Sequence, residues 1–117
     1  MKIGEVYADG RFGLSFELFP PKTPAGEKAL FEHLNRLIEF SPSFITCTYG
    51  AGGSTQAKTL DIIDRVQNAY ACMVASHLTC VGLSRHELIH YLREAAKRNI
   101  SNTVALRGET PQGAVAC

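Results

Sequence analysis

A glutamate lies inside an otherwise apolar run, Leu-Ser-Phe-Glu-Leu-Phe, at residues 14–19. A carboxylate in such a run must be paired or serve a purpose, because an unpaired buried charge is costly. Desolvation by the phenylalanines of this run would raise the pKa of Glu17 and suit it to act as a general acid near neutral pH. The structural alternative is a glutamate paired with a cation, for which Lys22 and Arg107 are the candidates.

A glycine-rich turn follows a second apolar run, in the stretch Phe-Ile-Thr-Cys-Thr-Tyr-Gly-Ala-Gly-Gly-Ser-Thr-Gln at residues 44–56. Glycines let a ligand approach the backbone closely, and Ser54 and Thr55 are residue types that cap helices. Backbone N–H groups at such a helix start attract anionic groups. A tight turn without a ligand explains the same residues, and Thr55 stands where a dinucleotide-binding G-x-G-x-x-G pattern would have its third glycine.

The sequence His-Glu-Leu-Ile-His at residues 86–90 matches the H-E-x-x-H pattern of zinc proteases. Two histidines four residues apart share a helix face, and Glu109 is a conceivable third ligand. Against a zinc hydrolase, Glu87 already completes a capping box with Ser84. The two histidines also share their face with Arg93 and Lys97, and neighbouring cations disfavour binding of a dication. We therefore expect no metal site here.

The composition is that of an ordinary globular domain: 117 residues, 45% hydrophobic, 20% charged, with a net charge of +1. This charge gives no reason to expect a nucleic acid or an anionic membrane as a partner, and no apolar run approaches a membrane span. The four cysteines form no C-x-x-C pair, which predicts reduced thiols. With no signal-peptide core at the N-terminus, we expect a cytoplasmic protein.

Segments with the two-residue apolar period of a strand alternate along the chain with segments that have the 3.6-residue period of a helix. Strands are predicted at residues 14–19, 44–49, 73–80 and 102–106, with helices between them that start at Thr23, after Thr55 and at Ser84. Such alternation implies one compact α/β unit, a parallel sheet with right-handed helical crossovers. Either an open doubly wound sheet or part of a (β/α)8 barrel fits this order.

The two faces of the predicted strands differ, because side chains alternate along a strand. One set is nearly all apolar and suits packing under helices: Leu14, Phe16, Leu18, Ile45, Cys47, Tyr49, Val74, Leu78, Cys80, Val104 and Leu106, with Ser76 as the exception. The other set is mostly small or polar: Ser15, Glu17, Phe19, Thr46, Thr48, Ala75, His77, Thr79, Thr103, Ala105 and Arg107. A doubly wound sheet should be apolar on both faces, so the pattern favours a barrel whose lumen opens into a polar site.

Four stretches together resemble the methylenetetrahydrofolate reductase family: Ser-Phe-Glu-Leu-Phe-Pro-Pro-Lys-Thr (15–23), Thr-Tyr-Gly-Ala-Gly-Gly-Ser-Thr (48–55), His-Leu-Thr-Cys-Val (77–81) and Ala-Leu-Arg-Gly-Glu (105–109). Their order and separations match the N-terminal part of that family. Its members are flavoproteins on a (β/α)8 TIM barrel, so the resemblance implies that fold and FAD as the cofactor.

Carried over residue by residue, the resemblance implies that Glu17 is the general acid that helps to open the imidazolidine ring of methylenetetrahydrofolate. It implies contacts to FAD at Thr48, Tyr49, Ala51, His77, Arg107 and Gly108. Glu109 stands where the family usually has aspartate, beside both flavin and folate, so Glu17 and Glu109 would contact the substrate. In the implied ping-pong reaction NAD(P)H reduces FAD, and the reduced flavin passes hydride to the folate to give 5-methyltetrahydrofolate.

We therefore expect residues 1–117 to be a single partial domain, the N-terminal half of a TIM barrel with its first four strands. A complete barrel of this kind has about 250 residues, so we expect a fragment or truncated chain, and a homo-oligomer when complete. A non-catalytic half-barrel that binds a partner or dimerises is the alternative from another class, and bound yellow flavin distinguishes the two.

Overall fold

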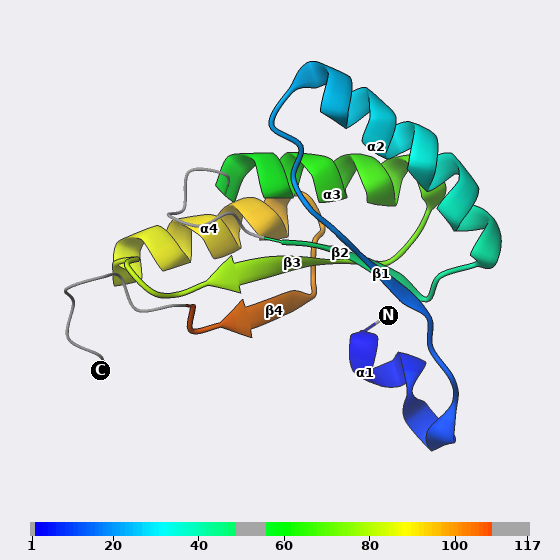
Figure 1. The fold of residues 1–117 in the computed structure, drawn as a ribbon. Helices are drawn as coiled ribbons and strands as arrows, with labels where there is room; N and C mark the ends of the chain where they lie inside the picture. The colour runs from blue at the N-terminus through cyan, green and yellow to red at the C-terminus, as the bar shows by residue number, and fades with distance from the viewer. Residues whose placement is uncertain (1, 49–55, 109–117) are drawn as a thin grey trace.

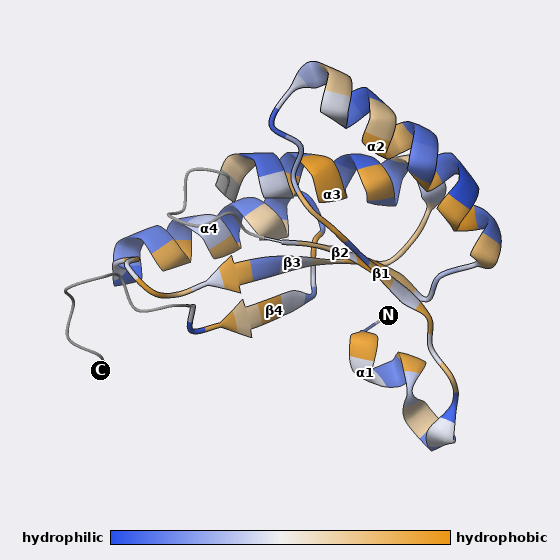
Figure 2. Cartoon of the chain, viewed as in Figure 1, coloured by the Kyte–Doolittle hydropathy of each residue, from blue (hydrophilic) through white to orange (hydrophobic). Residues whose placement is uncertain are grey.

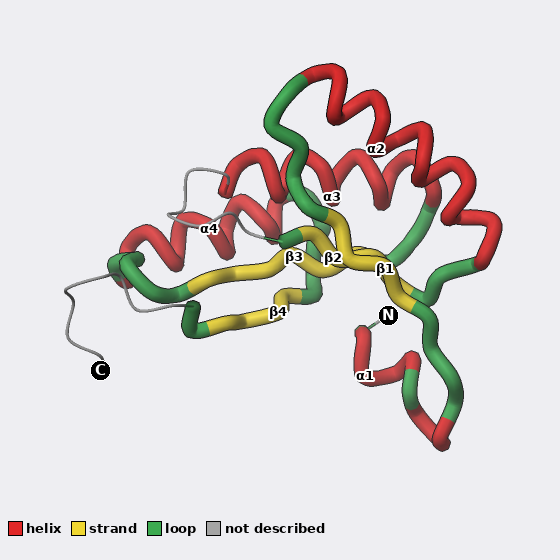
Figure 3. The backbone as a smooth tube through the Cα atoms, in the orientation of Figure 1, coloured by secondary structure: helices red, strands yellow, loops and turns green. Residues whose placement is uncertain are grey.

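The computed structural model describes residues 2–48 and 56–108. Across these ranges the chain alternates between helix and strand after a short N-terminal segment (Figure 3). That segment holds the one-turn helix α1 (Ile3–Val6) and the 3-10 turn η1 (Ala8–Gly10). The lead-in before the first strand is therefore partly helical, which the polar, glycine-containing sequence does not indicate.

The predicted elements are present, and the strands are shorter than expected. The strands are β1 (Ser15–Leu18), β2 (Phe44–Cys47), β3 (Val74–Thr79) and β4 (Thr103–Leu106). The helices are α2 (Pro24–Leu37), which continues into the 3-10 turn η2 (Ile38–Phe40), α3 (Gln56–Tyr70) and α4 (Arg85–Lys97).

Within the described residues, four parallel strands form one sheet in the order β1-β2-β3-β4. Figure 1 shows α2, α3 and α4 on the same side of this sheet. Sequential order with the helices on one face results from repeated crossovers of one hand, whereas a doubly wound sheet carries helices on both faces. The α/β fold is therefore confirmed, and its arrangement is that of the first half of a (β/α)8 barrel.

Helix starts are fixed by the side chains that the sequence indicates. The Thr23 hydroxyl accepts a hydrogen bond from the Gly26 N–H at 3.0 Å, and Pro24 follows at the first helical position. At α4, the Ser84 hydroxyl accepts from the Glu87 N–H at 3.1 Å, and the Glu87 carboxylate accepts from the Ser84 N–H at 3.2 Å. These caps set where the chain leaves each strand end and turns back along the sheet.

The hydrophobic core lies between the sheet and the helices. The buried strand residues are Leu18, Ile45, Cys47, Val74 and Leu78, and those from the helices and loops are Leu34, Leu60, Ile62, Ile63, Val66, Tyr91, Ala95 and Ile100. Burying each large aliphatic side chain contributes roughly 1.5–3 kcal/mol. The helices alternate between hydrophilic and apolar positions, as helices with one covered side do (Figure 2).

On α4 the sequence predicts an apolar stripe of Leu88, Ile89 and Leu92, and this prediction is partly wrong. Ile89 and Leu92 are 37% and 45% exposed, while Tyr91 and Ala95 are buried and Leu88 is half-buried. Residues 88, 91 and 95 follow the i, i+3, i+7 spacing of one helix face. Hydrophobicity alone favoured Ile89 and Leu92 for the buried face, whereas the structure buries Tyr91 and Ala95.

The face predicted for β4 is also wrong. Val104 pairs in register with His77, and Leu106 with Thr79, so both share the face of β3 that the helices do not cover. Alternation separates the two faces of a strand but does not say which face meets the helices. In a strand as short as β4 the hydrogen bonds to β3 decide, such as the Cys80 N–H to the Leu106 carbonyl at 2.8 Å.

The N-terminal segment closes the amino-terminal end of the strands. The Asn102 side chain accepts from the Ile3 N–H at 3.2 Å and donates to the Val74 carbonyl at 3.4 Å. The Tyr7 ring meets the edge of Phe44, with ring centroids 6.3 Å apart. In Figure 1, α1 lies below the sheet, away from α2, α3 and α4. The carboxyl ends of the strands lie at the other end, where the polar candidates gather.

Candidate active site

Glu17 and His77 meet on the face of the sheet that the helices do not cover. Glu17 Oε1 lies 3.3 Å from His77 Nε2, although β2 runs between their strands. Register pairs Glu17 with Thr46 and Thr46 with Ala75, so His77 lies two residues further along β3. In a (β/α)8 barrel the strand shear amounts to about one residue per strand, and layers in the lumen are built from alternate strands. The contact has the geometry of such a layer.

The surroundings of Glu17 differ from those expected. Its side chain is 53% exposed, and Phe19 beside it is 70% exposed, so the expected desolvation is absent. Among the ion pairs of the described residues, Glu17 pairs with His77 and not with Lys22 or Arg107. The His77 side chain is only 11% exposed, so its position is more restricted than that of Glu17.

Thr48 follows β2 directly and lies between the carboxyl ends of β1 and β3. Its N–H donates to the Leu18 carbonyl at 2.8 Å, which extends the pairing with β1. Its carbonyl accepts a hydrogen bond from the Thr59 hydroxyl of α3, also at 2.8 Å. Both backbone groups are therefore hydrogen-bonded, and Thr48 is held at the strand end where the resemblance predicts a flavin contact.

The end of β4 is held tightly against β3. The Cys80 N–H donates to the Leu106 carbonyl and the Val81 N–H to the Arg107 carbonyl, both at 2.8 Å. Because consecutive amides donate, the regular ladder ends here and strand alternation no longer decides where the Arg107 side chain points. Gly108 follows with φ +87°, and a Cβ there would lie 2.3 Å from Thr79 Cγ2. Only glycine fits this position without displacing the end of β3.

These residues fit a flavin nucleotide by their chemistry. They offer a hydroxyl (Thr48), an imidazole (His77) and an exposed guanidinium (Arg107) at the ends of neighbouring strands. No ion pair among the described residues involves Arg107, so its charge is available for phosphate. Open carboxyl ends of parallel strands are where ligands bind in barrels. Tyr49, Ala51 and Glu109, and the helix-capping Ser54 and Thr55, lie outside the described residues.

The H-E-x-x-H stretch forms no gathered site. His86 and His90 are exposed on α4, and Glu87 forms the capping box with Ser84. Within residues 2–48 and 56–108 there is no group of three or more His, Cys, Asp or Glu side chains that could hold a metal ion. The basic, solvent-exposed face expected for this helix is confirmed, since Arg93 and Lys97 are exposed as well.

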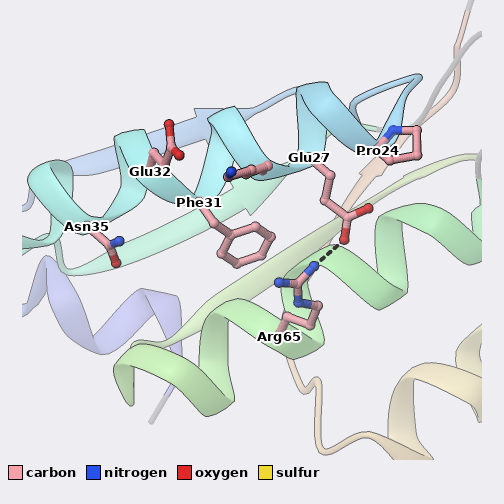
Figure 4. A pocket seen from close by; sticks show the side chains of 7 residues that line it. Pro24, Glu27, Phe31, Glu32, Asn35 and Arg65 are labelled. Atoms are coloured by element: carbon pink, nitrogen blue, oxygen red, sulfur yellow. Dashed lines mark hydrogen bonds and ion pairs between the residues drawn. The ribbon is translucent and has the colours of Figure 1, made fainter.

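A cavity of about 490 Å³ lies away from the strand ends, between α2 and α3. Figure 4 shows Arg65 of α3 pointing to Glu27 of α2, with Phe31 beside it. The guanidinium carbon of Arg65 lies 3.9 Å from the centre of the Phe31 ring, a cation–π contact. The same groups that line the cavity thus join the two helices, and we assign them a structural role.

Two buried hydroxyls at the back of the site are absent from the predicted residues. Thr59 is fully buried and donates to the Thr48 carbonyl, while Tyr91 is 2% exposed and donates to the His77 carbonyl at 3.1 Å. Both lie on the helical period of otherwise apolar residues. A hydroxyl residue on the apolar face of a helix was the signal that could have identified them, because a buried hydroxyl requires a hydrogen-bond partner.

Burial perturbs two acidic groups beside this pair of hydroxyls. Burial raises the pKa of the Cys47 thiol from 9.0 to about 12. Burial likewise raises the pKa of the Tyr91 phenol. Both groups are therefore protonated at neutral pH, Cys47 as an inert thiol and Tyr91 as a hydrogen-bond donor. The cysteines among the described residues are all free, and Cys117 lies outside them.

Comparison with known proteins identifies a family for this chain. A family model for methylenetetrahydrofolate reductase matches residues 2–116. "Methylenetetrahydrofolate reductase (NADH) 1" of Zea mays is 44% identical over 112 residues, which cover 96% of this chain and 19% of the maize protein. "5,10-methylenetetrahydrofolate reductase" of Escherichia coli (strain K12) is 36% identical over 104 residues, which cover 89% of this chain and 35% of that protein. The chain thus spans about a fifth to a third of the length of these relatives.

Among the described residues no helix is both long enough and apolar enough to cross a membrane. The family match includes Glu17, His77 and the ends of all the strands described above. It covers nearly the whole sequence, and the fold and the polar strand ends agree with it. This chain belongs to the methylenetetrahydrofolate reductase family.

Proposed function

We propose that this chain provides the N-terminal half of the barrel of an FAD-dependent 5,10-methylenetetrahydrofolate reductase. The reaction is the reduction of 5,10-methylenetetrahydrofolate to 5-methyltetrahydrofolate with NAD(P)H. The observation that carries the proposal is the contact of Glu17 with His77 at the open carboxyl ends of the strands, in a chain of this family. A carboxyl group placed there can give a proton to a ligand bound over the strand ends.

In this proposal Glu17 is the general acid. It donates its proton to the folate nitrogen that leaves as the imidazolidine ring opens, and it thereby makes the one-carbon unit ready to accept hydride. His77 Nε2, 3.3 Å away, orients the carboxyl group. When bound, FAD supplies the hydride carrier between the nicotinamide and the folate.

Residues around the strand ends hold the cofactor and the substrate. We propose Thr48, Tyr49, Ala51, His77, Arg107 and Gly108 as the FAD-binding residues, and Glu109 with Glu17 as the substrate-binding residues. Thr48, His77, Arg107 and Gly108 lie at or near the ends of β2, β3 and β4, which supports their assignment. The side chain of Glu109 is one methylene longer than the usual aspartate, so its carboxylate must fold back or shift to make the same contacts.

The electron donor and the setting of the protein are also proposals. The maize and Arabidopsis thaliana relatives carry NADH in their names, which makes NADH the first donor to test. We propose a cytoplasmic enzyme that forms homo-oligomers when complete. A single partial domain over residues 1–117 is proposed from the match to only part of each relative.

The proposal is tested with Glu17→Gln in the full-length protein. Only the folate half-reaction needs a proton donor, so flavin reduction by NADH should continue in the variant. Hydride transfer to methylenetetrahydrofolate should fall by roughly 10²–10⁴-fold, the range for general acid catalysis. Stopped-flow measurement at the flavin absorbance follows each half-reaction separately.

Glu27→Gln is the matched control, because it makes the same carboxylate-to-amide change in the outer cavity, where Glu27 pairs with Arg65. It should leave both half-reactions unchanged. Equal slowing of both half-reactions by Glu17→Gln would contradict the role of Glu17 as the acid. A wild-type protein that binds no FAD would contradict the proposed function as a whole.

A further inference from the structure

Two side chains from the helices reach the candidate site from behind the sheet. The Thr59 hydroxyl of α3 donates to the Thr48 carbonyl at 2.8 Å, and the Tyr91 hydroxyl of α4 donates to the His77 carbonyl at 3.1 Å. Thr59 and Tyr91 are 0% and 2% exposed. Both donors are thus built into the core, and both acceptors belong to residues that we assign to FAD binding.

The two carbonyls are located where the strand ladder stops. The last register pair between β2 and β3 is Cys47 with Ser76, and Thr48 and His77 are the next residues on each strand. A backbone carbonyl away from water requires a partner. The two hydroxyls supply partners at this end of the ladder, so the backbone there is fixed from the helix side.

We propose that Thr59 and Tyr91 are positioning residues for FAD, which act by fixing the backbone of Thr48 and His77. This inference rests on the proposed function, because it concerns the flavin that the strand ends would hold. Thr48 and His77 follow a register pair, so they lie side by side on neighbouring strands. Two hydrogen bonds to neighbouring residues restrict the movement of both strand ends where FAD would bind.

A second consequence concerns the pair of Glu17 and His77. The His77 backbone is fixed by Tyr91, and its imidazole lies 3.3 Å from the carboxylate. Moving the His77 backbone therefore moves the partner of Glu17 as well. The side chains of a binding site must be held to within about 0.5 Å to be productive. Loss of the Tyr91 hydroxyl should therefore displace both His77 and Glu17. The Tyr91 phenol is protonated at neutral pH and can donate, and burial raises its pKa further.

The test compares Tyr91→Phe, Thr59→Val and the double variant in the full-length protein. The readouts are the FAD dissociation constant, from flavin fluorescence, and the melting temperature of the FAD-free protein. Each single variant should raise the FAD dissociation constant about three- to tenfold, the effect of losing one hydrogen bond. Thr59→Ser keeps a hydroxyl at the same position and should restore FAD binding.

Tyr70→Phe is the matched control, since it removes a hydroxyl that donates to Asn35 Oδ1 at 2.7 Å between α3 and α2. It should leave the FAD dissociation constant unchanged and lower the melting temperature less than Tyr91→Phe does, because the bond of Tyr70 is exposed and that of Tyr91 is buried. A protein in which wild type binds FAD and the double variant binds it equally well would overturn this inference alone. The same weakening in Tyr70→Phe would also overturn it, because the effect would then be one of general stability. A wild-type protein that binds no FAD would overturn the proposed function and this inference with it.

Discussion

Glu17 Oε1 lies 3.3 Å from His77 Nε2 across an intervening strand. A flat sheet would separate side chains on alternate strands by roughly 9–10 Å, twice the spacing of neighbouring strands. The contact therefore requires the two side chains to reach toward each other over β2, on the face of the sheet that the helices do not cover.

Glu17→Gln should change the stability of the FAD-free protein by less than about 1 kcal/mol. The Glu17 side chain is 53% exposed, and ion pairs that water reaches contribute little to the free energy of unfolding. Urea denaturation of both proteins measures this difference, because urea does not screen the ion pair as guanidinium chloride does. A loss of roughly 3–5 kcal/mol, as for a broken buried pair, would instead make Glu17 a structural residue.

Gly108→Ala should destabilise the end of β4 and weaken FAD binding. A Cβ at this position would lie 2.3 Å from Thr79 Cγ2 and 2.7 Å from Val81 Cγ1, in addition to the cost of a positive φ. Strain from the backbone angle alone is of order 1–3 kcal/mol. Melting curves and FAD titration of the variant check both effects.

Gly82→Ala separates the strain from the steric clash. Gly82 also has a positive φ, +77°, but a Cβ there would meet nothing within 4 Å. It should show the strain without the displaced strand end, and so bind FAD normally. If both variants bind FAD equally well, the close approach of Gly108 to β3 has no role in the site.

Cys47 should make the stability of the protein fall at alkaline pH. The folded state keeps the thiol protonated up to a pKa of about 12, while the ordinary value of 9.0 applies to the unfolded chain. The unfolded state therefore loses the proton first, and stability declines as pH rises from about 9 toward 12. Between pH 8 and pH 10 the decline from this group is roughly 1 kcal/mol.

Cys47→Ala isolates this contribution, because it removes the thiol and leaves the other titrating groups in place. Urea denaturation at several pH values should show a smaller alkaline decline in the variant than in the wild type. Identical pH dependence in the two proteins would mean that the Cys47 thiol titrates alike in the folded and unfolded states.

Residues 1–117 produced alone should self-associate. β1 and β4 form the two edges of the sheet, and Leu106 at the end of β4 is 43% exposed. Unpaired strand edges are templates for pairing with another chain. Sedimentation velocity should show dimers or larger species, and Leu106→Lys should reduce them. A monodisperse monomer that melts cooperatively would contradict this expectation.

Periodic patterns were sufficient to predict the main elements and the face that Glu17 shares with His77. Helix starts were predictable at Thr23 and Ser84, because a cap is a local contact between residues three apart. The faces of β4 and of α4 were not predictable in the same way. Each depends on the neighbouring element that is reached through the fold, and not on the residues of the element itself.

In the candidate site, too, features set by nearby residues were predictable and features set by distant parts of the chain were not. The strand order places the carboxyl ends together, so the polar residues near them were predictable as one group. The exposure of Glu17 was not, since it depends on what covers the open face of the sheet. Thr59 and Tyr91 were missed because their acceptors are backbone carbonyls far away in sequence, which no side-chain motif records.

Asn102 also constrains the order of events during synthesis on the ribosome. Its side chain joins the Ile3 N–H to the Val74 carbonyl, and Ile3 precedes it by 99 residues. At roughly 5–20 residues per second, the N-terminal segment waits on the order of 5 to 20 s for this partner to be made. Tyr7 can meet Phe44 much earlier, but the hydrogen bond from the Ile3 N–H forms only after Asn102 has been made. The residues that are translated first are thus among the last to reach their native contacts.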